Sequence, residues 1–318
     1  ARPVIYGVYR TLVDPGDVVV FPLPSWNNNH YVQMTGARGV AVKCGADTRF
    51  LPTRDSILSS LGEARLLCLN SPLNPTGTAM SRDMLAGISE AILSENEKRK
   101  KTGKRPVFLM YDQIYWMLTA DGASHVTPPG IDPEMARYTI FVDGISKAFA
   151  ATGVRVGWAV GPVDVIDRMS SILGHVGAWA PRAEQVATAK FLDDTASIKT
   201  YVREIKQGIV GRLNALHEGF QAFKAQGLPV DSLSPEGAIY LTVRVAPFGK
   251  KTPDGTLLSS NEDIRKLLLD RAGVGVVPFQ AFGYPDDDGW FRLSVGAVSL
   301  REVQDALPRI GEALRALA

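Results

Sequence analysis

FVDGISKAFAATGVRVGWAVG, residues 141–161, holds one lysine, Lys147, in an otherwise small and apolar setting. Such a setting disfavours the charged form of an amine, which lowers its pKa and frees it to attack a carbonyl. Arg155 lies eight residues further on, and the small residues around Gly153 allow the chain to fold back between the two cations. We therefore expect both cations to face one ligand that carries an aldehyde and an anion. The alternative, for this stretch alone, is a strand–loop–strand segment with a surface lysine and arginine.

Short apolar runs alternate with helical stretches on both sides of this segment. Alternation of this kind predicts an α/β fold with a mostly parallel sheet sandwiched by helices. Ligands of such sheets bind beyond the carboxyl ends of the strands. Asn74, Asp112 and Lys147 each follow a predicted strand, so we expect them to share a site. Helices are expected near 29–35 and 81–101, and strands at 18–21, 40–43, 64–69, 106–111, 138–142 and 154–160.

The pattern changes at about residue 181. Two long helical stretches, 181–192 and 196–226, are followed by shorter strands and helices up to the end of the chain. We expect a large domain at 1–210 and a smaller α+β domain at 211–318, joined by the long helix at about 196–226.

Composition excludes several classes of protein. A formal net charge of +2 gives no electrostatic footprint for nucleic acid, and no uncharged apolar run reaches the length of a membrane span. The four histidines lack metal-ligand spacing, so no metal site is expected. Cys44 and Cys68 lie in apolar strand-like runs, which gives no indication of a disulfide framework. A reducing cytoplasm is the expected location.

Two polar motifs follow predicted strands. In YDQIY, Asp112 and Tyr115 lie three residues apart, which places their side chains on one face of a turn or helical start. In NPTG, Pro75 and Gly77 fix the loop so that the Asn74 side chain points in a set direction. The alternatives, for each motif taken alone, are a capping aspartate beside a core tyrosine and a plain turn.

Trp26 and Arg292 lie in two further motifs. Trp26 stands in LPSWNNNHY, where its ring suits offset stacking on a flat, electron-poor ring. The three asparagines after it argue against an interior position. Arg292 stands in WFRLSVGA, and a fixed guanidinium is a natural bidentate partner for a carboxylate. The alternatives are a core tryptophan and a surface ion pair.

In this order and spacing the motifs resemble the class I, or fold-type I, pyridoxal-phosphate-dependent aminotransferases of the aspartate and aromatic type, over essentially the whole chain. The resemblance implies a seven-stranded type of sheet, a homodimer, and a Schiff base between Lys147 and pyridoxal 5′-phosphate (PLP). It also implies a role for each remaining residue: Asp112 pairs with the pyridinium nitrogen, Tyr115 and Asn74 bind the ring's 3-oxygen, Trp26 stacks on the ring, Arg155 contacts the phosphate, and Arg292 with Asn74 binds the substrate.

The beginning of the chain resembles the end of the family's phosphate-binding turn. Ala1, Arg2 and Pro3 are therefore expected near the cofactor phosphate, where backbone N–H groups at a helix N-terminus bind the anion. Gly144 stands where many members carry a phosphate-binding serine, so no hydroxyl role is expected there. The family's N-terminal segment, which reaches the partner subunit, is expected to be missing. A chain without it is expected to dimerise but to bind PLP poorly.

The expected reaction is transamination between an α-amino acid and a 2-oxo acid, in which Lys147 moves the substrate proton as general base and then as acid. Two alternatives remain. One is a PLP-dependent β-lyase or decarboxylase on the same fold, and the other is the aminotransferase-like domain of a transcription regulator. No second arginine is identifiable as the partner of a dicarboxylate, so the preferred amino acid stays open.

Overall fold

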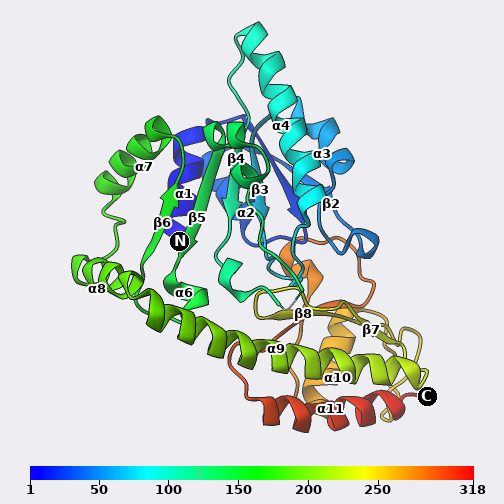
Figure 1. Cartoon of the computed structure of the whole chain (residues 1–318). Coiled ribbons are helices and arrows are strands. Elements are labelled where there is room, and N and C mark those ends of the chain that lie inside the picture. Colours follow the sequence, from blue (N-terminus) through cyan, green and yellow to red (C-terminus); the bar gives the residue numbers. More distant parts are fainter. Residues whose placement is uncertain (121) are drawn as a thin grey trace.

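Two β-sheets organise the chain in the computed structural model, which describes residues 1–120 and 122–318 (Figure 1). The larger sheet has the strand order β2-β1-β3-β4-β5-β6. All neighbouring pairs are parallel except β5 and β6, which confirms the expected mostly parallel sheet. It has six strands among the described residues, one fewer than the seven-stranded type. The bounds are β1 Val18–Leu23, β2 Arg38–Lys43, β3 Ala64–Asn70, β4 Phe108–Asp112, β5 Thr139–Gly144 and β6 Gly157–Val160.

Helices cover both faces of the larger sheet. Leu66 and Leu67 are neighbours in β3 and both are fully buried, one in the core on each face. This burial on both faces is why the parallel strands read as continuous apolar runs. One face is covered by α1 (Arg2–Leu12), α2 (Asn28–Thr35) and α7 (Val163–Val176), and the other by α3 (Arg54–Leu61), α4 (Arg82–Thr102) and α5 (Pro128–Ile131). Of these, α3, α5 and α7 were not predicted from the sequence.

The smaller sheet is antiparallel, with the strand order β7-β8-β10-β9. It forms one core with the helices at its side, to which Leu213 and Phe220 of α9 contribute. The elements are α8 (Arg182–Asp193), α9 (Thr195–Ala225), β7 (Val230–Ser232), β8 (Tyr240–Val245), α10 (Asn261–Ala272), β9 (Val277–Pro278), β10 (Trp290–Ser294) and α11 (Leu300–Arg315).

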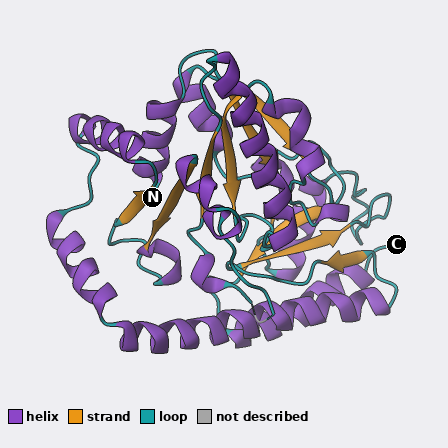
Figure 2. Cartoon of the chain, turned by 45° about the horizontal axis from the view of Figure 1, so that its top comes forward, coloured by secondary structure: helices purple, strands orange, loops and turns teal. Residues whose placement is uncertain are grey.

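The helix α9 contacts both halves of the chain. Figure 2 shows it as one continuous helix along the molecule. Its 31 residues correspond to a length of about 46 Å. The domain boundary expected at residue 210 falls inside this helix, and that boundary stays a prediction.

The expected return of the chain after Lys147 is present. β5 and β6 pair with Gly144 opposite Gly157, and the loop between them turns at Ala150 and Arg155, whose φ angles are 49° and 63°. A Cβ atom on Gly144 would lie 2.8 Å from the Cα atom of Gly157, so this close approach requires glycine. The strand begins at residue 157 rather than at 154, because the residues before it complete the turn.

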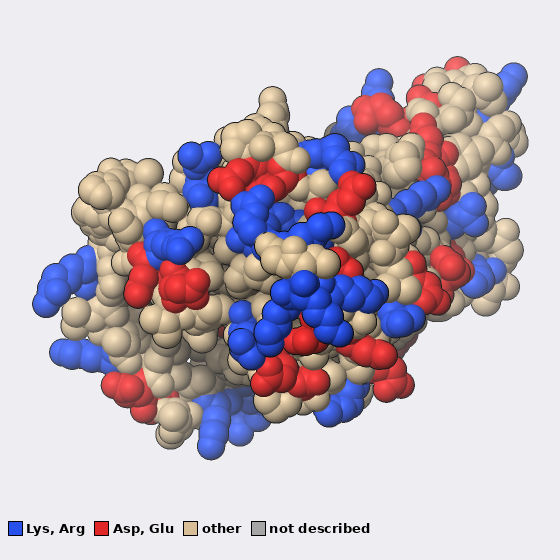
Figure 3. All heavy atoms as spheres, turned by 90° about the horizontal axis from the view of Figure 1, so that it is seen from above, with Lys and Arg blue, Asp and Glu red and all other residues tan. Residues whose placement is uncertain are grey.

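Charged side chains of both signs are mixed over the face of the molecule in Figure 3, as a net charge of +2 would allow. No helix within residues 1–120 and 122–318 is both long and apolar enough to cross a membrane. The same residues contain no group of three or more His, Cys, Asp or Glu side chains that could hold a metal ion.

Candidate functional site

A cavity of about 460 Å³ lies at the carboxyl ends of β3, β4 and β5. The three side chains that follow these strands meet there, as the position rule for parallel sheets predicts. All of the predicted site residues line it: Ala1, Arg2, Trp26, Asn74, Asp112, Tyr115, Lys147, Arg155 and Arg292. The sequence therefore predicted the members of the cavity, although the role of each one stays a prediction.

Lys147 lies on α6 (Ile145–Ala148), a single helical turn that directly follows β5. Its side chain is half-buried. Burial lowers the pKa of the Lys147 amine, and the positive charges of Arg2 and Arg292 lower it further. Among the described residues, no carboxylate is named as shifting this pKa. An amine in this position loses its proton more easily than a surface lysine, as a nucleophile or general base requires.

Asp112 ends β4 and accepts a hydrogen bond from the Ile114 N–H, with 3.0 Å between Oδ1 and N. Burial raises the pKa of the Asp112 carboxyl to about 6, and the nearby carboxylate of Asp143 acts in the same direction. A buried carboxylate of this kind gains stability when a cation is placed beside it. The electrostatics therefore suit a protonated ring nitrogen next to Asp112.

Arg292 projects into the cavity from β10. Its Nη1 donates to Asn74 Oδ1 at 3.0 Å, and its guanidinium lies over the rings of Tyr240 and Phe282, 4.6 and 4.8 Å from their centroids. Its Nε is buried and has no hydrogen-bond partner among the described residues. An unpaired buried donor on a fixed guanidinium is suited to a carboxylate ligand.

Asn74 keeps an amide donor that a ligand could use, whereas the hydroxyl of Tyr115 already has a hydrogen-bond partner. Because the Oδ1 atom of Asn74 accepts from Arg292, its amide N–H group is left to donate. The hydroxyl of Tyr115 lies 2.8 Å from that of Tyr240, and both residues are buried. Tyr240 also lines the cavity. Sequence analysis did not select it, since its position beside Tyr115 depends on contact between the two sheets.

Trp26 and Arg155 lie at exposed positions of the cavity. Trp26 has 42% of its surface exposed and lies 6.0 Å from the ring of Phe282, so the alternative of a core tryptophan is wrong. Arg155 is exposed, and its Nη1 donates to the Thr152 carbonyl at 2.5 Å. It forms no ion pair with the residues that the structure describes, which leaves its charge available for an anion.

Asp143 is a buried carboxylate that sequence analysis missed. It accepts hydrogen bonds from Trp116 Nε1 at 2.9 Å, from Gln113 Nε2 at 3.2 Å and from the Gly144 N–H at 2.7 Å. It thereby fixes the segment after Asp112 against the end of β5. Burial raises the pKa of the Asp143 carboxyl, although these three donors oppose the rise.

A deprotonable amine, the half-buried carboxylate of Asp112 and two arginines without an ion pair among the described residues surround one cavity. They form a site for a ligand with a carbonyl, a ring cation and anionic groups. Comparison with known proteins gives the family: residues 1–310 match the aminotransferase class I and II family, and the chain belongs to it. It is accordingly an aminotransferase, a transferase of nitrogenous groups.

Two curated relatives illustrate the similarity. The aspartate aminotransferase of Rhizobium meliloti (strain 1021) is 30% identical over 316 residues, which cover 98% of this chain and 72% of the relative. A probable aspartate/prephenate aminotransferase of Rickettsia prowazekii (strain Madrid E) is 31% identical over 322 residues, with 99% of this chain and 75% of that protein covered.

Solved structures agree with this result. The crystal structure of the Rhizobium meliloti aspartate aminotransferase has a TM-score of 0.87 and 29% identity, and covers 100% of this chain and 75% of that one. The Thermus thermophilus aspartate aminotransferase with maleate has a TM-score of 0.84 and 26% identity, and covers 98% of this chain and 74% of that one. The fold class and the transamination predicted from the motifs are confirmed.

Proposed function

We propose that Lys147 carries PLP as a Schiff base and that this chain uses it to transfer amino groups between an α-amino acid and a 2-oxo acid. The observation that carries the proposal is the half-buried Lys147 amine, with its lowered pKa, in one cavity with Asp112 and Arg292. The members of the named family that resemble this chain over nearly its full length are aminotransferases.

The residues around the cavity fit this cofactor. Asp112, whose pKa is raised by burial, would hold the pyridinium nitrogen, and the free amide N–H of Asn74 would donate to the ring's 3-oxygen. Trp26 would stack on the ring, and Arg155 would bind the phosphate together with backbone N–H groups at the N-terminus of α1. When bound, PLP supplies an electron sink that stabilises negative charge at the substrate Cα.

The protein's own residues position the substrate and move its proton. Arg292 would bind the α-carboxylate through the guanidinium N–H groups that Asn74 does not occupy, which fixes the direction of the Cα–H bond. The Nζ atom of Lys147 would then remove the Cα proton and later return it as general acid. Because burial and the charges of Arg2 and Arg292 lower the pKa of the amine, Nζ is deprotonated more readily than the amine of a surface lysine and can accept the proton.

We further propose a dicarboxylic amino acid, aspartate, as the amino donor. Two relatives carry aspartate in their names. Sequence analysis found no second arginine for a dicarboxylate, whereas Arg2 lines the cavity close enough to Lys147 to lower its pKa. Arg2 is therefore the candidate partner of the second carboxylate, in place of the phosphate role first expected. Replacing it by Gln should raise KM for aspartate more than KM for alanine; an equal change in both, with weaker PLP binding, would return Arg2 to the phosphate.

Products distinguish transamination from the other reactions considered. The chain loaded with PLP is incubated with aspartate and 2-oxoglutarate, and glutamate is measured against the aspartate consumed. Transfer gives one glutamate for each aspartate. Ammonia without glutamate would indicate a lyase, carbon dioxide with a new amine a decarboxylase, and no turnover at all a regulatory domain. None of the comparisons favours these alternatives.

A homodimer in the cytoplasm is the proposed state of the protein. Val160 of β6, Val163 of α7 and Trp179 expose 59%, 76% and 65% of their surfaces on consecutive segments of one edge, and such apolar patches are typical of subunit contacts. Cys44 and Cys68 are both free and buried, which suits a reducing compartment. Light scattering should give twice the chain mass, and Val163→Asp should shift it toward one chain. Leu58→Asp, on the distant helix α3, is the matched control.

A further inference from the structure

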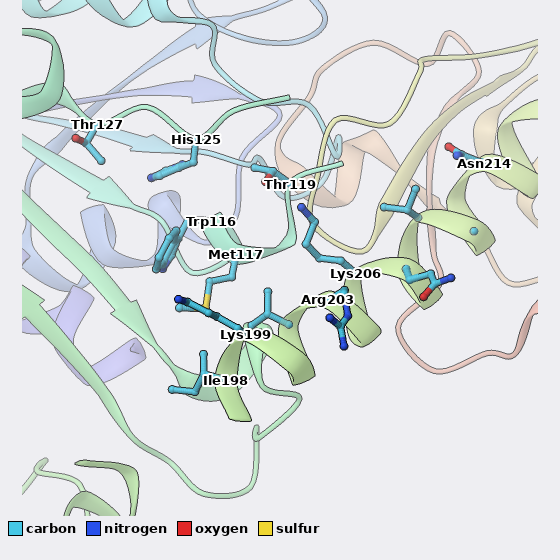
Figure 4. A pocket seen from close by; sticks show the side chains of 14 residues that line it. Trp116, Met117, Thr119, His125, Thr127, Ile198, Lys199, Arg203, Lys206 and Asn214 are labelled. Carbon is cyan, nitrogen blue, oxygen red and sulfur yellow. The ribbon is translucent and has the colours of Figure 1, made fainter. Parts of the chain in front are cut away.

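A second hollow, of about 1200 Å³, lies between α9 and the segment that follows Asp112 and Tyr115 (Figure 4). Asp112 and Tyr115 face the cavity of Lys147, whereas Trp116 and Met117 line this second hollow. One short segment thus separates two cavities. No step of the proposed transamination uses a residue of the second.

The α9 wall of this hollow is cationic. Lys199, Arg203 and Lys206 follow one another at spacings of four and three residues, which places them on one face of the helix. Figure 4 shows Lys199 and Lys206 reaching across the gap toward Met117 and Thr119. None of the three cations forms an ion pair with the residues that the structure describes. Within residues 1–120 and 122–318, the lining of this hollow includes no Asp or Glu.

The opposite wall is aromatic, and hydrogen bonds to residues outside the hollow fix its two rings. The rings of Trp116 and His125 lie 6.0 Å apart, and Trp116 Nε1 donates to Asp143 at 2.9 Å. His125 Nε2 lies 3.3 Å from Gln113 Oε1, and burial lowers the pKa of His125 to about 4. The imidazole is therefore neutral at pH 7, so among the described lining residues the positive charge comes from α9. Four apolar side chains also line the hollow, Met117, Ile198, Val202 and Val210, together with the uncharged polar residues Thr119, Thr127, Gln207 and Asn214.

We propose that this hollow binds a small aromatic carboxylate at a site separate from the cavity of Lys147. An aromatic ring is the group that gains from contact with Trp116, His125 and the apolar side chains. A carboxylate is the group that pairs with the three cations of α9. A neutral aromatic molecule leaves those cations unused, and a purely polar anion leaves the aromatic wall uncovered.

The test uses 2-naphthoate as the probe and its uncharged amide, 2-naphthamide, as the matched ligand. Both are titrated calorimetrically into the PLP-loaded chain at low ionic strength. The carboxylate should bind saturably with one site per chain, and the amide should bind more weakly. Binding should persist in Arg292→Gln, which weakens the carboxylate partner in the other cavity. Loss of binding in that variant would place the probe at the substrate site and overturn the proposal.

Two sets of variants separate this hollow from general electrostatics. Replacing Lys199, Arg203 and Lys206 by Gln should weaken 2-naphthoate by about tenfold or more, since each exposed pair contributes modestly by itself. The control replaces three exposed and distant lysines of α4, Lys98, Lys100 and Lys101, and should leave the affinity unchanged. Equal affinity in the two triple variants, or tighter binding of an acidic peptide than of 2-naphthoate, would overturn the proposal.

The ring of Trp116 provides an independent check. Trp116→Phe keeps an aromatic wall but removes the hydrogen bond to Asp143, whereas Trp116→Ala removes the wall itself. We expect affinity to be nearly retained in the first variant and to fall about tenfold in the second, in proportion to the lost ring contact. A loss of the same size in both would mean that the Asp143 bond, and not the ring, matters, and would contradict an aromatic ligand.

Discussion

The cofactor-free protein should become more stable when Asp112 is replaced by Asn. In an unfolded chain this carboxyl titrates near 3.8, and in the folded chain it titrates near 6 because burial disfavours its charge. Between these two pKa values the carboxyl is mostly protonated in the folded state and mostly ionised in the unfolded state. The free energy of unfolding therefore falls as the pH rises from about 4 to about 6. Above about pH 6 the full loss of stability is present. Below about pH 4 there is none, because Asp112 is protonated in both the folded and the unfolded protein.

The size of this effect follows from the separation of the two pKa values. Each unit is worth about 1.4 kcal/mol, so the ionised Asp112 costs on the order of 3 kcal/mol above pH 6. Asn retains an oxygen that accepts from the Ile114 N–H, so the hydrogen bond at 3.0 Å is kept. In a chain of this length such a gain corresponds to a rise in Tm of roughly 5 °C.

Thermal unfolding followed by circular dichroism at pH 7.5 and pH 4, with and without PLP, measures this directly. Without PLP, Asp112→Asn should be more stable at pH 7.5 and unchanged at pH 4. With PLP bound, the unmutated protein should be more stable than Asp112→Asn at pH 7.5. The pyridinium of PLP pairs with the carboxylate of Asp112, whereas Asn carries no charge for it to pair with. Asp167→Asn, at an exposed carboxylate of α7, is the control and should change neither value. A cofactor-free variant no more stable than the native protein at pH 7.5 would refute this reasoning.

Three further substitutions test other parts of the site. Lys147→Ala should abolish glutamate formation by several orders of magnitude while PLP still binds, and borohydride should no longer attach PLP to the chain; near-normal turnover would exclude Lys147. Arg292→Lys should raise KM for the amino acid by about tenfold, because a lysine lacks the paired N–H groups that bind a carboxylate; an unchanged KM would assign Arg292 to structure. Gly77→Ala should destabilise the chain by more than about 2 kcal/mol, because φ is +71° and its Cβ would lie 2.1 Å from the Tyr240 carbonyl oxygen; a denaturation midpoint equal to that of the native protein would contradict this.

Much of the fold was predictable because local sequence determines it. The strands β1, β3, β4 and β5 are apolar runs buried on both faces, and α4 begins after a cap at Ser81 and ends before a left-handed Gly103. The helices α3 and α7 were not predicted, since only two residues of each are buried: Ile57 and Leu61 in α3, and Val165 and Met169 in α7.

Members of the cavity were predictable because each motif follows a strand and the strands end at one edge. Interactions between side chains that lie far apart in the sequence could not be predicted. Arg2 acts on Lys147 across 145 positions of sequence, and Asp143 accepts from Trp116 across 27. The sequence around these residues contains no signal for either contact, because each arises only when the sheet brings the two segments together.

The long helix α9 contains two glycines near its middle, where its resistance to bending is expected to be lowest. Gly208 and Gly211 stand on either side of the expected domain boundary, and a Cβ on either would meet nothing closer than 3.8 Å, so packing does not require glycine there. Two glycines without a steric reason lower the local resistance of a helix to bending. A rocking motion of the smaller unit against the larger would concentrate its strain at these two residues. Amide hydrogens around them should then exchange faster than those one turn away on either side, and Ala at both positions should remove the difference.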